Sequence, residues 1–167
     1  MYLLVGGLVD VLSIGESKLD DSFPSSQFYL PNFKAPYRLD VSCNRGGLLT
    51  FVKSDIPSRR LFEFDFLSDI QIIPIELTLK TKTWILFNVY KPLRQKSHYF
   101  LDTLSKAILF YSKYDNIIIN GDLNIESGNP ELASFLELNS MHNHMKEKTC
   151  WKSQSGTCID LIISNRN

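Results

Sequence analysis

Residues 116–126, NIIINGDLNIE, join an apolar run to an acid and an amide through a single glycine. The apolar residues predict a buried strand, and Gly121 allows the backbone to turn or to approach a ligand closely. A two-residue period places Asp122 and Asn124 on one side of the chain. Strand ends commonly hold ligands in α/β folds, and an acid beside an amide suits a hydrated cation or a phosphate. The alternative is an ordinary turn rich in Asp and Asn.

The remaining sequence predicts an α/β fold in which strands predominate. Strand-like patterns occupy residues 9–16, 46–53, 69–79, 83–90 and 159–164. One helix is expected over residues 97–111 with Ser97 as its cap, and a second begins at Asn129 and Pro130 and ends near Asn139. The last strand is apolar on both faces after Asp160, which predicts a place inside the sheet.

Length and charge limit the possible functions. The 167 residues, 44% of them hydrophobic, are enough for one domain with a real core. Eighteen basic residues balance eighteen acidic ones, so any contact with nucleic acid must be local and weak. Arg38, Arg45, Lys91 and Arg94 are expected in loops, where they either flank a binding cleft or are ordinary solvated charges.

The cysteines and the first residues bear on localisation. Three cysteines without a CxxC pair favour a reducing intracellular setting, cytoplasmic or nuclear, over secretion. The apolar start of the chain reaches an acid at Asp10, too soon for a signal peptide or a membrane span. No membrane partner is expected.

Three further polar residues stand at strand ends. Glu16 closes a strand as Asp122 does, and two such carboxylates can share Mg²⁺; a surface charge is the alternative. Tyr90 ends a strand beside Pro92, where it can donate to a phosphate oxygen or serve as a rim aromatic. Asp160 begins an apolar strand, so a buried carboxylate there needs a partner.

Four segments in this order resemble the endonuclease/exonuclease/phosphatase superfamily, metal-dependent phosphodiesterases that include apurinic endonucleases and non-LTR retrotransposon endonuclease domains. They are LSIGESKLD (12–20), FNVYKP (87–92), INGDLN (119–124) and GTCIDLIIS (156–164). The order and spacing of four segments are more specific than any single one. The resemblance implies an α/β two-sheet αββα sandwich of the DNase-I type, with residues 1–167 as a single partial domain.

The resemblance also implies a role for each candidate residue. Glu16 would bind Mg²⁺ or Mn²⁺, and Tyr90 would contact the scissile phosphate. Asp122 would orient the attacking water, and Asn124 would hold the phosphate or transition state. Asp160 would orient a histidine.

Two segments of the family are expected to be missing: an earlier strand with an asparagine, and a final block with a catalytic histidine. The three histidines present, His98, His142 and His144, do not match that block, and the last two are expected in a solvated loop.

Three functional hypotheses follow. The first is a retrotransposon-derived, Mg²⁺-dependent endonuclease that hydrolyses DNA phosphodiester bonds, joined to a reverse transcriptase domain in a parent polyprotein. The second is a non-catalytic remnant that binds metal or nucleic acid weakly, because loss of the histidine removes general acid/base assistance worth ~10²- to 10⁴-fold. The third, a phosphatase or lipid phosphodiesterase, is disfavoured by the retrotransposon-like segments.

Overall fold

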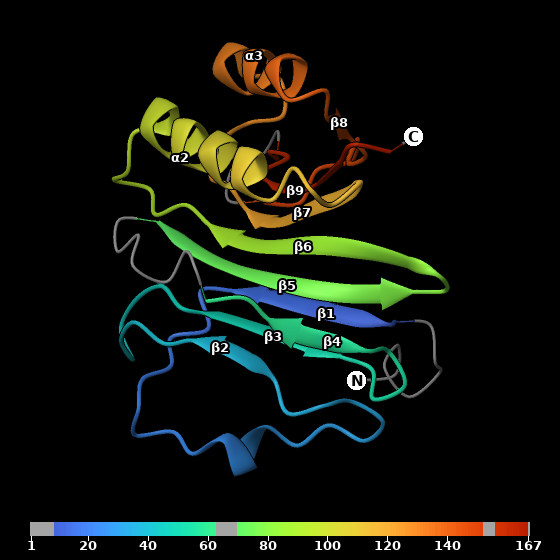
Figure 1. The fold of residues 1–167 in the computed structure, drawn as a ribbon. Coiled ribbons are helices and arrows are strands. Elements are labelled where there is room, and N and C mark those ends of the chain that lie inside the picture. The colour runs from blue at the N-terminus through green and yellow to red at the C-terminus, as the bar shows by residue number, and fades with distance from the viewer. Residues whose placement is uncertain (1–8, 63–69, 152–155, 167) are drawn as a thin grey trace.

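The computed structural model describes residues 9–62, 70–151 and 156–166 as two packed β-sheets with helices outside (Figure 1). The smaller sheet is antiparallel and has the order β1 (Val11–Gly15), β3 (Leu48–Val52), β2 (Tyr37–Leu39). The larger sheet has the order β4 (Ser58–Arg60), β5 (Gln71–Leu79), β6 (Lys82–Tyr90), β7 (Asn116–Asp122), β9 (Asp160–Ser164), β8 (His142–Asn143). Among the described strands, only β6 and β7 pair in parallel.

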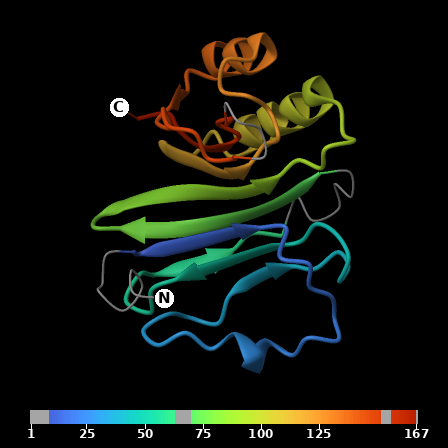
Figure 2. The ribbon, with the colours of Figure 1, turned by 180° about the vertical axis from the view of Figure 1, so that it is seen from behind.

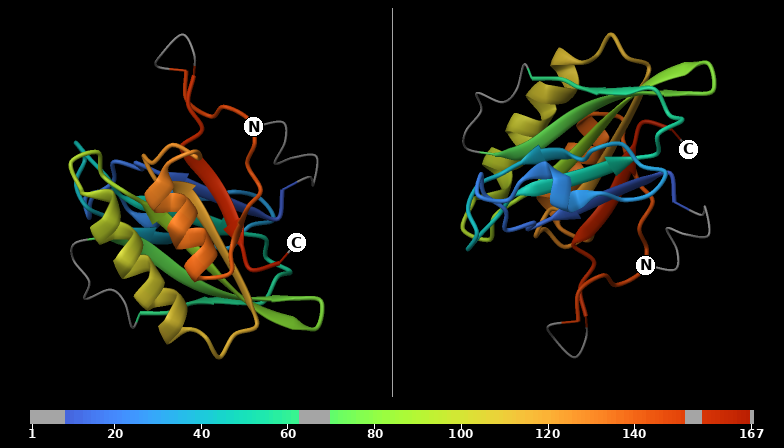
Figure 3. Two further views of the ribbon diagram at one scale, coloured as in Figure 1. Left: turned by 90° about the horizontal axis from the view of Figure 1, so that it is seen from above. Right: turned by 90° about the horizontal axis from the view of Figure 1, so that it is seen from below.

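Two α-helices cover the outer face of the larger sheet. The helices α2 (Ser97–Phe110) and α3 (Pro130–Leu138) contact each other and lie side by side over the strands when seen from above (Figure 3). The outer face of the smaller sheet carries the short 3-10 helix η1 (Ser25–Phe28), whose Phe28 packs there. The predicted two-sheet α/β fold is confirmed. No helix in the described part of the chain is long and apolar enough to span a membrane.

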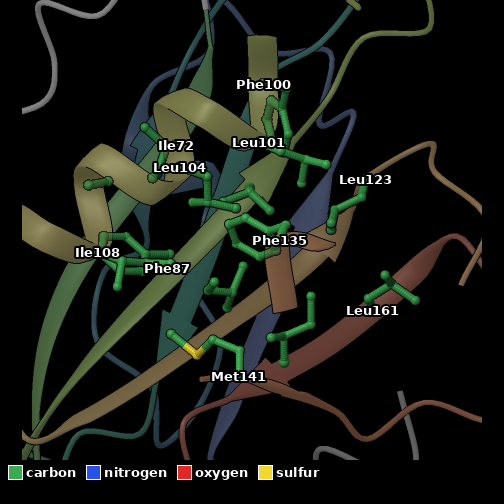
Figure 4. Close-up of a cluster of buried hydrophobic side chains, with 14 of the residues drawn as sticks. Ile72, Phe87, Phe100, Leu101, Leu104, Ile108, Leu123, Phe135, Met141 and Leu161 are labelled. Carbon is green, nitrogen blue, oxygen red and sulfur yellow. The ribbon is translucent and has the colours of Figure 1, made fainter. Parts of the chain in front are cut away.

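The main core lies between the helices and the larger sheet (Figure 4). Phe87 of β6 and Ile119 of β7 are fully buried from the sheet side, and Phe100 and Leu104 of α2 are fully buried from above. This arrangement follows from the two-residue period of the strands and the three-to-four-residue period of the helix. A second core fills the space between the two sheets, where Leu48 and Ile73 are both fully buried.

The predicted N-cap was correct for α3 and wrong for α2. Asn129 caps α3 as predicted, since its Oδ1 accepts hydrogen bonds from Glu131 N at 2.8 Å and Leu132 N at 3.3 Å. The prediction for Ser97 was wrong: Lys96 is the N-cap of α2, Ser97 is its first helical residue, and no side chain caps this end. The preceding loop is anchored instead through the backbone and the side chain of Lys91.

The final strand is internal to the sheet but buried on one face only. β9 lies between β7 and β8, as predicted, with Leu161 and Ile163 in the main core. Ile162 is 45% exposed, however, so burial on both faces was a wrong prediction. The physical reason is the narrowness of the smaller sheet: its strand β1 packs on β6 and β7, and Ile162 lies one strand beyond them.

Replacing Leu104 by alanine is expected to lower the free energy of unfolding by about 2–5 kcal/mol, because it opens a cavity in the main core. Leu109 stands on the exposed side of the same helix, 73% exposed, so Leu109→Ala should change stability by less than about 0.5 kcal/mol. Urea unfolding of both variants measures the difference. Equal losses would contradict the described packing of α2.

A charged contact ties the edge strand β4 to β5 and to the loop after α2. Arg59 donates two hydrogen bonds to Glu76, Nε to Oε1 at 2.8 Å and one guanidinium NH₂ nitrogen to Oε2 at 2.9 Å, and the Tyr114 hydroxyl donates to Oε2 at 2.5 Å. The hydrogen bonds from Arg59, and secondarily that from Tyr114, hold the pKa of the Glu76 carboxyl below its ordinary value.

This shift makes a pH-dependent contribution to stability. A carboxyl whose pKa is lower in the folded chain stabilises the fold above its unfolded pKa, about 4.5, and the contribution is lost as pH falls further. Glu76→Gln should therefore be less stable than the unsubstituted chain at neutral pH, and the gap should narrow on acidification below that value. Urea unfolding at a series of pH values tests it; a gap that stays constant would show that Glu76 stabilises the fold without its charge.

Candidate active site

Glu16 and Tyr90 meet where β1 and β6 end. The Tyr90 hydroxyl donates a hydrogen bond to Glu16 Oε1 at 2.6 Å. Tyr90 is 5% exposed, whereas Glu16 is exposed to solvent. Burial raises the pKa of the Tyr90 hydroxyl, and the hydrogen bond to Glu16 and the charge of Asp122 raise it further. Tyr90 is therefore a protonated donor that holds a solvent-accessible carboxylate in place. Its side chain is buried, although it lies at the end of a strand.

Asp122 joins this pair at the end of β7. It is the direct partner of Tyr90 in the parallel register of β6 and β7. Gly15, the last residue of β1, lies so close that a Cβ there would be 3.8 Å from both Asp122 Cβ and a ring carbon of Tyr90. Figure 2 shows β1 running across the inner side of the larger sheet. Three strands thus bring Glu16, Tyr90 and Asp122 together.

Gly121 allows β6 and β7 to pack closely, and the sequence interpretation that it allows a ligand to approach is not needed to explain it. Its φ is +143°, and a Cβ there would lie 1.9 Å from the Val89 carbonyl oxygen of β6. Any larger residue would push β7 away from β6, so the glycine serves strand packing. The close approach is to backbone.

Asn124 reaches Asp122 through a turn rather than through strand alternation. β7 ends at Asp122, and Asn124 has a left-handed φ of 46°. The Asn124 backbone N–H donates to Asp122 Oδ1 at 2.9 Å, and its side-chain amide donates to Asp122 Oδ2 at 3.3 Å and to the Lys91 carbonyl at 2.8 Å. The predicted two-residue period was wrong here, and the local structure is the Asx turn weighed as the alternative. The turn orients the Asp122 carboxylate.

Backbone strain accompanies the carboxylate of Glu16. Its φ is 51°, a region that costs a residue other than Gly or Asn about 1–3 kcal/mol. The next two residues are held to the turn before β3, through Ser17 N to Gly47 O at 3.1 Å and Lys18 N to Gly46 O at 2.8 Å. The surrounding backbone thereby fixes Glu16 in a conformation it would not otherwise adopt.

Asp160 lies beside the site, but it is not buried. It is the direct antiparallel partner of Asp122, so both side chains project from the same face of the sheet. Asp160 is exposed, and its carboxylate has no hydrogen-bond partner among the described residues; its backbone N–H donates to Thr149 Oγ1 at 3.0 Å. The predicted burial was wrong, because the smaller sheet does not extend over β9.

The sequence analysis did not predict a layer of buried polar side chains between the two sheets next to the site. Asn88 is fully buried and lies two residues before Tyr90, on the same face of β6. Its side-chain amide donates to Thr50 Oγ1 at 2.9 Å and to the Leu49 carbonyl at 3.3 Å. The buried oxygens Asn88 Oδ1, Asn120 Oδ1 and Ser13 Oγ have no hydrogen-bond partner among the described residues. An asparagine inside each of two apolar strands was the available signal, because unpaired buried amides are costly.

The donor set suits a magnesium ion better than a closed metal site. Within the described ranges no three His, Cys, Asp or Glu side chains gather as metal ligands. Glu16 and Asp122 supply two carboxylates at one strand edge, with Glu16 open to solvent. Mg²⁺ binds one or two carboxylates and keeps several waters, so these residues fit it.

The histidines lie away from this site. His142 belongs to β8 and pairs with Ser164, and His144 Nε2 lies 2.8 Å from Ser164 Oγ. Ser164 is at the far end of β9 from Asp160. The expectation of a solvated loop was wrong for His142, which is exposed but lies in the short strand β8, and was confirmed for His144, which is exposed and follows that strand. His98 lies in the first turn of α2, beside Glu131 of α3.

Two of the four basic residues expected in loops do not lie free there. Arg38 is in β2, paired with Asp40 at 2.6 Å, and Lys91 is 2% exposed, with its amine donating to the Gln95 carbonyl at 3.0 Å. Burial lowers the pKa of Lys91. Arg45 and Arg94 are exposed: Arg45 precedes Gly46, whose carbonyl accepts a hydrogen bond from Lys18 N, and Arg94 follows Tyr90 by four residues.

Residues 3–167 match the model of the endonuclease/exonuclease/phosphatase family. The chain belongs to this family. No curated protein matches it.

Similar folds occur among solved structures of this family. The endonuclease domain of TRAS1, a telomere-specific non-LTR retrotransposon, superposes with a TM-score of 0.73 at 10% identity, covering 97% of this chain and 75% of that one. An AP endonuclease from Archaeoglobus fulgidus gives 0.64 at 16% identity, covering 98% and 79%. The catalytic domain of human Nocturnin gives 0.65 at 12% identity, covering 98% and 71%. At these identities the similarity establishes the fold.

Titration with Mn²⁺ should show one weak site that depends on both carboxylates. Glu16→Gln and Asp122→Asn should each weaken binding about tenfold or more, because each removes a charged ligand. Asp102, an exposed carboxylate on α2, provides the control, and Asp102→Asn should leave binding unchanged. Paramagnetic relaxation or calorimetry measures the affinity; unchanged binding in both site variants would place the metal elsewhere.

Proposed function

We propose that this family member is a Mg²⁺-dependent hydrolase of DNA phosphodiester bonds. The observation that supports the proposal most is the convergence of Glu16, Tyr90 and Asp122 at three strand ends, two of them linked by a 2.6 Å hydrogen bond. The retrotransposon origin and the association with a reverse transcriptase domain belong to the same proposal. They rest on the retrotransposon-like segments of the sequence.

Each residue has a role that its contacts support. Tyr90 holds the Glu16 carboxylate with its single hydroxyl hydrogen, and this hydrogen would turn to a phosphate oxygen when a substrate binds. Asp122, oriented by the Asn124 backbone, accepts a hydrogen bond from the attacking water. Both amide hydrogens of Asn124 are directed at Lys91 O and Asp122 Oδ2, so Asn124 would have to give up one of these bonds to donate to a phosphate. Asp160 adds negative charge beside Asp122.

Bound Mg²⁺ would neutralise charge on the phosphate and favour attack by water. The ligands available to it are the carboxylates of Glu16 and Asp122. The strained φ of Glu16 supports a functional use, since strain of this kind gathers at active sites.

The described residues do not place a histidine at the site to act as general acid or base. None of the three histidines lies at the strand ends that hold Asp122 and Glu16. We propose that the histidine comes from outside these 167 residues, and that a further strand pairs with β1, the edge of the smaller sheet among the described residues. The same observation favours the alternative of a non-catalytic remnant.

DNA contact is proposed for the exposed Arg45 and Arg94. Each phosphate they neutralise should contribute about −0.9 to the slope of log affinity against log salt, so the total slope should be shallow.

The decisive experiment is plasmid nicking with and without added imidazole. The 167-residue chain should nick slowly in Mg²⁺, and free imidazole should accelerate nicking because it supplies the acid/base group. Asp122→Asn should lower the imidazole-stimulated nicking rate by about 10²-fold or more. Asp102→Asn should leave this rate unchanged. Chelation should stop the reaction.

Two results would contradict the proposal. Nicking that persists in Asp122→Asn would place the chemistry elsewhere. Complete inactivity with imidazole, together with Mn²⁺ binding at Glu16 and Asp122, would establish the remnant instead.

A further inference from the structure

A cavity of about 570 Å³ opens at the end of the larger sheet opposite the candidate active site. Its walls come from the turn between β5 and β6, the loop between α2 and β7, and the residues after β9. Asn116, the first residue of β7, lies in its lining, whereas Asp122 ends the same strand. At ~3.3 Å per residue the two places are about 20 Å apart. The cavity is therefore separate from the site already described.

The lining is positively charged. Lys82, Lys113 and Arg166 contribute three cations, against the single carboxylate of Asp115. None of the three cations forms a salt bridge with a described acid. Lys113 lies over the ring of Tyr114, 5.2 Å from its centroid. Glu76, whose pKa is lowered mainly by Arg59, also feels the charge of Lys113, but its carboxylate is already paired with Arg59. The cations around the cavity therefore outnumber the acids, which favours an anionic ligand.

Arg166 is held in place for such a ligand. Its Nε donates to Asn116 Oδ1 at 2.9 Å, and one NH₂ nitrogen donates to the Asp115 carbonyl at 3.0 Å. Asn116, 4% exposed, is fixed in turn by donating to the Thr83 carbonyl at 3.0 Å. A guanidinium has five N–H donors, so three remain for another acceptor. A pre-positioned guanidinium with free donors matches the oxygens of a phosphate.

We infer that this cavity binds a phosphate group. The Arg166 guanidinium takes two phosphate oxygens, Lys82 and Lys113 balance the charge, and the hydroxyls of Thr81 and Thr83 lie in the same lining. The phosphate belongs either to a small phosphorylated compound or to a nucleic-acid strand. The inference stands without the proposed hydrolase activity, because no residue of the candidate active site takes part.

Calorimetric titration with pyrophosphate, in the presence of a chelator, tests the site without metal or cleavage. Lys82→Gln should weaken binding about threefold, and Arg166→Gln about tenfold or more. Asp115→Asn should strengthen binding, because it removes the opposing charge while keeping the carbonyl that Arg166 contacts. Lys106→Gln removes an exposed charge from α2 and should change nothing.

A short single-stranded oligonucleotide then separates the two sources of phosphate. If Lys82→Gln also weakens oligonucleotide binding and reduces its salt slope by about 0.7, a nucleic-acid strand is the ligand. If only pyrophosphate binding changes, a small phosphorylated compound is the ligand. Pyrophosphate binding that is undetectable, or equal in the Lys82→Gln, Asp115→Asn and unsubstituted chains, would overturn the inference. Lys82 is exposed, so its variant remains informative if Arg166→Gln misfolds.

Discussion

Parallel pairing between β6 and β7 sets where the candidate catalytic groups lie. The pairing places Tyr90 directly beside Asp122, and α2 makes the crossover that parallel strands require. Gly121 makes the pairing tight, since any Cβ there would collide with the Val89 carbonyl. β1 packs across these two strands, so the residue after its end, Glu16, arrives within hydrogen-bonding distance of Tyr90. The register of β6 and β7 thus determines two positions of the site, and the packing of β1 on them determines the third.

Several residues in and around the site lower the stability of the fold. Glu16 takes a left-handed φ, and Asn88 and Asn120 carry buried amide oxygens without described partners. Each feature costs free energy that apolar residues would not. The cost is offset by the main core on the other face of the same strands, where Phe87 and Ile119 are fully buried. β6 and β7 therefore carry polar groups on one face and the fold's hydrophobic anchor on the other.

The sequence predicted features that depend on local chemistry. Tyr90 was predicted at the end of a strand, and it is the last residue of β6. Asn129 and Pro130 marked the start of α3 correctly, because a cap acts within one helical turn. Two failures were local, the cap at Ser97 and the two-residue period at Asn124, and the others concern long-range packing. Burial of Asp160 and Ile162 depends on how far the smaller sheet extends, and burial of Lys91 depends on the loop that folds over it. No local pattern encodes those distances.

The strand register also decides whether a histidine of this chain can act at the site. β8 pairs with the end of β9 at Ser164, and Ser164 pairs with Ile118, four residues before Asp122 on β7. Four residues of strand span about 13 Å, well beyond the reach of an imidazole from a neighbouring strand. His144 is further held by its contact with Ser164 Oγ. Moving His142 to the level of Asp122 would require a shift of four residues in the β8–β9 pairing, which would displace Met141, buried in the main core, from its place before β8. His144 follows β8 and donates its backbone N–H to Ile162, so it would need a shift of two residues, and β9 still lies between it and β7. The sheet that assembles the carboxylates is the same structure that keeps these histidines from them.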